Sequence, residues 1–179
     1  MSQRSAIILV NPSRSEAVSA AIELSAILIK EGFQLFSSSD VQIDGVINTS
    51  LETLPDIEIA IILGGDGTIL RGAEATLLRN IPLLGVNLGK VGFLAEVSKP
   101  SVAEIAQSVI KRSYVYETRM VLGYSIDRDG KEISQGWALN EITVERSSTT
   151  MVELFVEIDK RPLSHWGCDG LICSTPTGS

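Results

Sequence analysis

A continuous apolar run, IEIAIIL at residues 57–63, leads directly into Gly64-Gly65-Asp66-Gly67-Thr68. An unbroken run of this kind is typical of a strand that is covered on both faces in a parallel sheet. The next segment, TILRGAEATLLR at residues 68–79, has apolar positions at helical spacing. A strand, a glycine-rich loop and a helix in this order predict a loop at the carboxyl edge of an open sheet, where such sheets bind ligands.

The rest of the first 114 residues repeats this alternation of strands and helices. We expect further strands in SAIILV (5–10), FQLFSS (33–38) and LLGVNL (83–88), and helices at 15–31 and 100–112. Gly32 would end the first helix, Pro100 would start the last, and residues 38–55 hold turn formers with no clear pattern. The prediction is an α/β domain with a parallel sheet over residues 1–114.

The pattern changes in residues 115–179, where short runs alternate between apolar and polar residues. Asp129-Gly130 lies between two such runs and is a hairpin signal. No helical spacing is found beyond residue 113. We therefore expect an all-β segment, the first part of a second domain.

The loop after residue 63 has residues suited to phosphate chemistry. Gly65 and Gly67 would let the backbone approach a ligand closely, and Thr68 could cap the helix that follows. The amino end of that helix would favour an anion. Asp66 could take a proton from an attacking hydroxyl or hold Mg²⁺, or it could simply hydrogen-bond the backbone of a tight turn. The Walker A spacing is absent.

A second glycine-containing loop, Gly89 to Leu94, follows the next expected strand. Both loops should open on the same edge of the sheet. Phe93 in this loop is either an apolar anchor for the loop or a ring that packs against a flat ligand such as adenine.

Charge and composition exclude several classes of function. The net charge of −7 argues against broad nucleic-acid binding, although local amides and a few cations can still hold phosphates. The apolar runs are too short to span a membrane, and the N-terminus reads as a strand rather than a signal peptide, so we expect a cytoplasmic protein. Cys168, Cys173 and the single His165 do not have the spacing of a zinc site, so no residue is assigned as a dedicated metal ligand.

Four segments, in this order, resemble the successive motifs of NAD kinases, and together they span most of the chain. They are Gly64 to Thr68, Asn87 to Leu94, Asn140-Glu141, and DGLICSTPTGS at residues 169–179. The first motif is shared with diacylglycerol and sphingosine kinases, and its core with phosphofructokinases. The second and fourth are more selective.

The resemblance implies a fold, a reaction and partners. NAD kinases transfer the terminal phosphoryl group of ATP, or of polyphosphate in some members, to the 2′-hydroxyl on the adenosine ribose of NAD. They need a divalent cation such as Mg²⁺, they form homodimers or homotetramers, and their site lies between an α/β domain and an all-β domain. No nucleic-acid or membrane partner is implied.

The resemblance also assigns roles to residues of this sequence. Asp66 would be the general base. Gly65, Gly67 and Thr68 would line the donor side, which Arg71 could also reach, although a solvated helix face is the simpler interpretation of Arg71. Phe93 would flank the substrate, and Asn87 is assigned as a further cofactor-binding residue. The residues assigned to the NAD pocket are Asn140, Glu141, Asp169 and Thr177.

The sequence departs from the family pattern at its end, because it stops at Ser179 inside the fourth motif. The family continues with residues that line the NAD pocket, so we expect little activity from the isolated chain. Two alternatives stay open. One is a lipid or sugar kinase that shares the first motif, and the other is a catalytically incomplete nucleotide-binding fragment.

Overall fold

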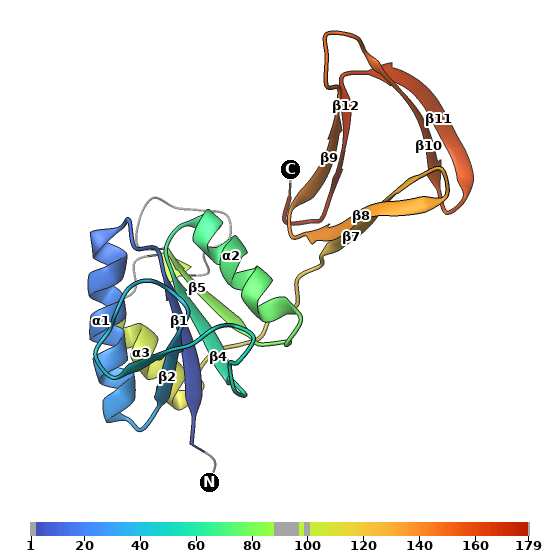
Figure 1. Cartoon of the computed structure of the whole chain (residues 1–179). Helices are drawn as coiled ribbons and strands as arrows, with labels where there is room; N and C mark the ends of the chain where they lie inside the picture. The colour runs from blue at the N-terminus through green and yellow to red at the C-terminus, as the bar shows by residue number, and fades with distance from the viewer. Residues whose placement is uncertain (1–2, 88–96, 99–100, 179) are drawn as a thin grey trace. The chain divides into compact units, whose positions relative to one another are not determined.

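The computed structural model describes residues 3–87, 97–98 and 101–178. The chain divides into two units, Met1–Tyr116 and Glu117–Ser179 (Figure 1). In the described parts, no helix is both long enough and apolar enough to cross a membrane.

The first unit is built on a six-stranded sheet in which every pair of neighbouring strands is parallel. The strand order is β3-β2-β1-β4-β5-β6. The strands are β1 (Ser5–Val10), β2 (Gln34–Ser37), β3 (Val46–Asn48), β4 (Ile59–Leu63), β5 (Leu83–Asn87) and β6 (Val97–Ser98). From β1 the chain adds strands first on one side and then on the other, so the direction of winding reverses between β1 and β4.

The helices of this unit are α1 (Ser15–Lys30), α2 (Asp66–Leu77) and α3 (Val102–Lys111). Gly32 follows α1 with a φ of +86°, a left-handed conformation that glycine adopts without strain, so this predicted helix end is confirmed. The predicted start of α3 is wrong. Ser101 is the N-cap, and its hydroxyl accepts a bond from the Glu104 N–H (3.2 Å) in a capping box, so the helix begins at Val102.

The core follows from the strand pattern. Alternate residues of β1 and β4, such as Ile8 and Ile61, pack in the main apolar cluster with α1 and α3. Ile7, Ala60 and Ile62, on the opposite face of these strands, are also buried, and Ile62 lies against α2. Helices therefore cover both faces of the sheet (Figure 1), which explains the unbroken apolar run in β4 and confirms the predicted α/β fold.

The second unit consists of three antiparallel two-stranded ribbons. They pair β7 (Leu122–Arg128) with β8 (Lys131–Ala138), β9 (Glu141–Glu145) with β12 (Gly170–Ser174), and β10 (Val152–Ile158) with β11 (Arg161–Cys168). Asp129 and Gly130 both have positive φ at the β7–β8 turn, which confirms the predicted hairpin. Large apolar side chains such as Phe155 (64% exposed) and Ile172 (61%) face solvent, and the buried apolar residues described all belong to the first unit.

Candidate active site

The loop between β4 and α2 positions Asp66. Gly65 is the extended N-cap of α2 (φ −94°, ψ −175°), and its carbonyl accepts bonds from the N–H groups of Thr68 (2.8 Å) and Ile69 (3.1 Å). Thr68 is therefore buried inside the first turn rather than capping the helix, so that prediction is wrong. Gly64 is required by packing, because a Cβ there would lie 2.5 Å from the Thr68 hydroxyl oxygen.

Asp66 is the first residue of α2. Its Oδ1 atom is buried, and no hydrogen-bond donor reaches it from the described residues. A buried carboxylate oxygen without a donor is costly, and native structures seldom keep one without a reason. The arrangement leaves that oxygen for a proton, a hydroxyl or a cation that is not part of the chain.

A hollow of about 390 Å³, which we call the Asp66 hollow, lies over this loop. It is lined by Asn11, Arg14, Gly65, Asp66, Gly67, Thr68 and Arg71. The structure thus brings together the predicted general base, Asp66, and the four predicted donor-side residues, Gly65, Gly67, Thr68 and Arg71. A ligand here would also meet the first N–H groups of α2, which have no partner inside the helix.

Asn11 and Arg14 belong to the loop after β1, and no motif of the sequence predicts their place in this hollow. The Asn11 N–H donates to the Leu63 carbonyl (3.1 Å) and ties this loop to the end of β4. Arg14 precedes α1, and its Nη2 lies 3.3 Å from the point where a Gly65 Cβ would sit. The signal that could have found them is the strand order, because β1 and β4 are neighbours at the point where the winding reverses.

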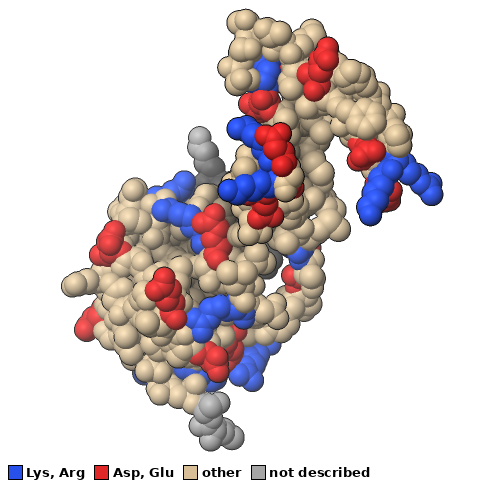
Figure 2. Space-filling model, turned by 45° about the vertical axis from the view of Figure 1, so that its right-hand side comes forward, with Lys and Arg blue, Asp and Glu red and all other residues tan. Residues whose placement is uncertain are grey.

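The charge of the Asp66 hollow differs from that of the whole protein. Arg14 and Arg71 are exposed and line the same hollow as one carboxylate, that of Asp66, and neither guanidinium has an ion-pair partner in the described part of the chain. The protein as a whole carries −7, and on the face drawn in Figure 2 basic and acidic side chains are interspersed. Two guanidinium groups with free donors beside a glycine-rich turn suit a phosphate chain.

Of the second motif, Asn87 to Leu94, only Asn87 is described. It is the buried last residue of β5, next to Val86, whose carbonyl accepts a bond from the Gly64 N–H (3.1 Å). This places Asn87 at the same edge of the sheet as the glycine-rich loop. Phe93 lies outside the described residues.

In the second unit, the structure brings together three predicted residues, Asn140, Glu141 and Thr177. The Thr175 N–H donates to the Asn140 carbonyl (2.8 Å), and the Thr175 hydroxyl lies 2.8 Å from that of Thr177. A Cβ on Gly178 would lie 2.9 Å from a Glu141 carboxylate oxygen. The Asn140 Oδ1 atom is buried without a donor among the described residues, so this turn also offers a polar atom to a ligand.

Asp169 does not join this group within the unit. The register of β9 and β12 pairs Ser174 with Glu141 at one end and Gly170 with Glu145 at the other. Asp169 precedes Gly170 at the far end, where it forms an exposed ion pair with Arg146 (Nε to Oδ1, 3.2 Å). Its assignment to the NAD side stays a prediction.

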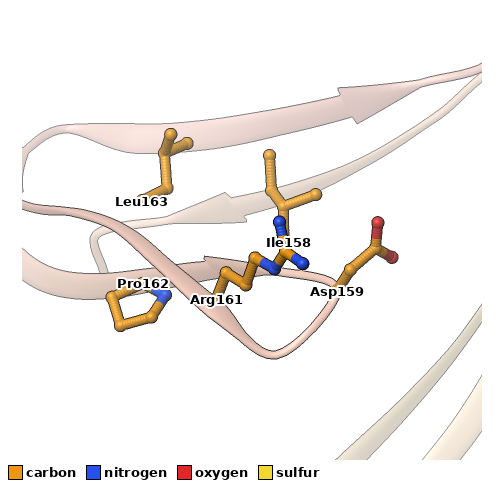
Figure 3. Close-up of a pocket in the computed structure, with 5 residues that line it drawn as sticks. All are labelled: Ile158, Asp159, Arg161, Pro162 and Leu163. Atoms are coloured by element: carbon orange, nitrogen blue, oxygen red, sulfur yellow. The ribbon is translucent and has the colours of Figure 1, made fainter.

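Another hollow, of about 450 Å³, surrounds the tip of the β10–β11 hairpin. Figure 3 shows its five lining residues, Ile158, Asp159, Arg161, Pro162 and Leu163, around one tight turn. They come from a single exposed hairpin, and the hollow has neither a helix terminus nor one of the two buried oxygens that lack a donor in the described chain. It has no feature of a catalytic site.

Comparison with known proteins identifies the family. Residues 6–114 match the ATP-NAD kinase N-terminal domain family. The chain belongs to the NAD kinase family. It is 35% identical to NAD kinase 2 of Streptomyces avermitilis over 98% of this chain, and 38% identical to an NAD kinase of Mycobacterium leprae over 99% of it.

This member of the NAD kinase family spans about 62% of the length of these relatives. Its fold is similar to that of a yeast NADH kinase crystallised with NADH, with a TM-score of 0.81 and 22% identity. The alignment covers 98% of this chain and 58% of the yeast chain. At that identity the likeness supports the fold.

Proposed function

We propose that the protein is an NAD kinase that transfers the terminal phosphoryl group of ATP to the 2′-hydroxyl on the adenosine ribose of NAD. The observation that carries the proposal is the Oδ1 atom of Asp66, buried without a donor among the described residues in a hollow that also holds two unpaired guanidinium groups. Family membership supports NAD as the acceptor, because the relatives named above are NAD kinases.

In this proposal Asp66 accepts the proton as the ribose hydroxyl attacks. A ribose hydroxyl is a weak nucleophile, and a positioned base typically contributes two to four orders of magnitude in rate, about 10²–10⁴. Arg14, Arg71 and the first N–H groups of α2 hold the donor phosphates in line with that hydroxyl and balance their charge. Asn140, Glu141 and Thr177 contact NAD.

A divalent cation fits this set of residues. Among the described residues, no three carboxylate, histidine or cysteine side chains gather around one point. Mg²⁺ in phosphoryl-transfer sites is commonly held by one or two carboxylates, with phosphate oxygens and waters as its other ligands. Asp66 is the carboxylate available here, and the bound ion would neutralise charge on the donor phosphates.

The test uses the protein expressed from its own gene, supplied with NAD, ATP and Mg²⁺, with NADP quantified by an NADP-specific dehydrogenase. We expect Asp66→Asn to lower turnover by roughly 10² or more, because it removes both the base and the carboxylate available for Mg²⁺, while NAD affinity stays unchanged because the residues that contact NAD remain. Asp44→Asn removes an exposed carboxylate of the same unit outside the Asp66 hollow, and it should keep full turnover.

Two results would refute the proposal. Equal turnover in Asp66→Asn and in the unmodified protein would remove Asp66 from the mechanism. Phosphorylation of diacylglycerol or of fructose 6-phosphate, with no NADP formed, would favour a lipid or sugar kinase.

Two further measurements complete the description of the reaction. Replacing ATP by polyphosphate in the same assay identifies the phosphoryl donor. Light scattering tests whether the protein forms the expected homodimer or homotetramer.

A further inference from the structure

A second hollow, of about 430 Å³, adjoins the Asp66 hollow, and we call it the β1–β2 hollow. Thr68 and Arg71 line both, so the two hollows are neighbours along α2. Its volume lies within the range of small-molecule sites. Its walls are the carboxyl end of β1, the loop after β2, Leu51 and one face of α2, with lining residues Leu9, Val10, Pro12, Ser38, Ser39, Asp40, Leu51, Thr68, Arg71, Gly72, Glu74 and Ala75.

The place of this hollow in the sheet points to a nucleoside. The order β3-β2-β1-β4-β5-β6 is that of doubly wound nucleotide-binding sheets. In those sheets the phosphates lie at the end of the first strand, and an acidic residue near the end of the second strand binds ribose hydroxyls. Here Asp40 comes three residues after β2, which ends at Ser37, and it lines the hollow.

The loop that carries Asp40 is held by a buried serine. Ser37 is 2% exposed, and its Oγ accepts a bond from the Ser39 N–H (3.2 Å) and lies 2.9 Å from the Ser39 Oγ. These bonds fix the chain just before Asp40. Asp40 itself is exposed and has no ion pair or hydrogen bond with a residue that the structure describes, so its carboxylate can accept bonds from a ligand.

The chemistry of the walls changes along the hollow. Leu9, Val10, Pro12, Leu51 and Ala75 form an apolar part that suits a flat base. Hydroxyl groups and the Asp40 carboxylate suit ribose hydroxyls. Arg71 stands where this hollow meets the Asp66 hollow, and a guanidinium group at that place suits the phosphates that would join the two.

We propose that the β1–β2 hollow binds the nucleoside of the phosphoryl donor, with Asp40 accepting hydrogen bonds from its ribose. The proposal rests on the proposed function, because it needs the donor phosphates to lie in the Asp66 hollow. It makes a nucleoside triphosphate the donor, since polyphosphate would leave this hollow without a ligand.

Calorimetric binding of ADP and of tripolyphosphate, with Mg²⁺ and without NAD, tests the site in the protein expressed from its own gene. We expect Asp40→Ala to weaken ADP binding roughly tenfold, the usual scale for lost bonds to a charged acceptor. Tripolyphosphate has no ribose, so its affinity should change by less than about twofold. Asp44→Ala makes the same change of charge in the same loop but outside the β1–β2 hollow, and it should leave ADP binding unchanged.

Comparing 2′,3′-dideoxy-ADP with ADP on the same protein cancels any difference in how much of a variant is folded. The unmodified protein should bind this analogue roughly tenfold more weakly than ADP, and Asp40→Ala should bind the two equally. Failure of the unmodified protein to bind ADP, or equal ADP affinity in Asp40→Ala and Asp44→Ala, would overturn the proposal even where NADP is formed. Absence of NADP formation would instead refute the proposed function, and the ADP affinities would still decide whether this hollow binds a nucleoside.

Discussion

Glu58 joins three separate segments at the amino edge of the sheet, and its removal should destabilise the first unit. Arg4, which precedes β1, donates from Nε to Glu58 Oε2 (2.9 Å) and from Nη2 to Oε1 (2.5 Å). Arg112, which follows α3, donates from Nη2 to Oε2 (2.9 Å). Arg4 also donates to the carbonyls of Val109 (2.8 Å) and Ile110 (2.7 Å) at the end of α3.

The size of the effect follows from the pKa of Glu58. Hydrogen bonds from Arg4 lower it from its ordinary 4.5 to about 2, although burial opposes them, and Arg112 adds to the lowering. The Glu58 side chain is 17% exposed, whereas that of Arg112 is 63% exposed and more strongly screened by water. A lowering of this size corresponds to about 3 kcal/mol of stability when the carboxylate is ionised.

The direction of the pKa shift determines the pH range over which Glu58 stabilises the first unit. Because the pKa is lower in the folded state than in the unfolded state, this stabilisation is complete above the ordinary 4.5 and is lost as the pH falls toward 2. Glu58→Gln should therefore lower the free energy of unfolding by about 3 kcal/mol at neutral pH and by only about 1 kcal/mol near pH 3.

Urea unfolding followed by far-ultraviolet circular dichroism measures this difference. The described helices all lie in the first unit, whereas both tryptophans, Trp137 and Trp166, lie in the second, so fluorescence would report the wrong unit. Asp56→Asn removes an exposed carboxylate two residues earlier and should cost less than about 0.5 kcal/mol. The reasoning would be refuted if Glu58→Gln lowered the free energy of unfolding equally at neutral pH and near pH 3. It would also be refuted if Glu58→Gln lowered that free energy by no more than Asp56→Asn does.

The sequence predicts the elements of the first unit well where local pattern decides them. β4 is continuous and apolar because both of its faces are buried, and Gly32 ends α1 because the position needs a positive φ. β3 was missed because three residues in a turn-rich segment carry no period, and only pairing with β2 makes them a strand. Thr68 was misassigned as a cap because α2 begins two residues earlier than its apolar spacing indicates.

The site was predicted only as far as its motifs reach. Asp66 and its glycines stand in one short stretch, so the sequence displays them together. Asn11 and Arg14 lie more than fifty residues earlier in the printed sequence. They enter the site because β1 pairs with β4, and strand order is a non-local property that periodicity does not encode. In the second unit, alternation predicts strands but does not specify which of them pair, so the separation of Asp169 from Glu141 needed the register.

Two further predictions separate ligand binding from folding at the Asp66 hollow. Arg14→Gln and Arg71→Gln should each raise the KM for ATP roughly tenfold and leave the KM for NAD unchanged, because each removes a charged donor to phosphate; a rise in the NAD KM alone would contradict this. Among the glycines, a Cβ at Gly64 would lie 2.5 Å from Thr68 Oγ1, whereas one at Gly67 meets no described atom within 4 Å. Gly64→Ala should therefore lower the urea midpoint by an amount equivalent to roughly 1–3 kcal/mol. Gly67→Ala should keep or raise that midpoint, since alanine favours a helix, yet reduce NADP formation roughly 10²-fold by occupying space that the reactants need. Full activity in Gly67→Ala would mean that no reactant approaches the backbone there, and the phosphates would then have to bind elsewhere in the hollow.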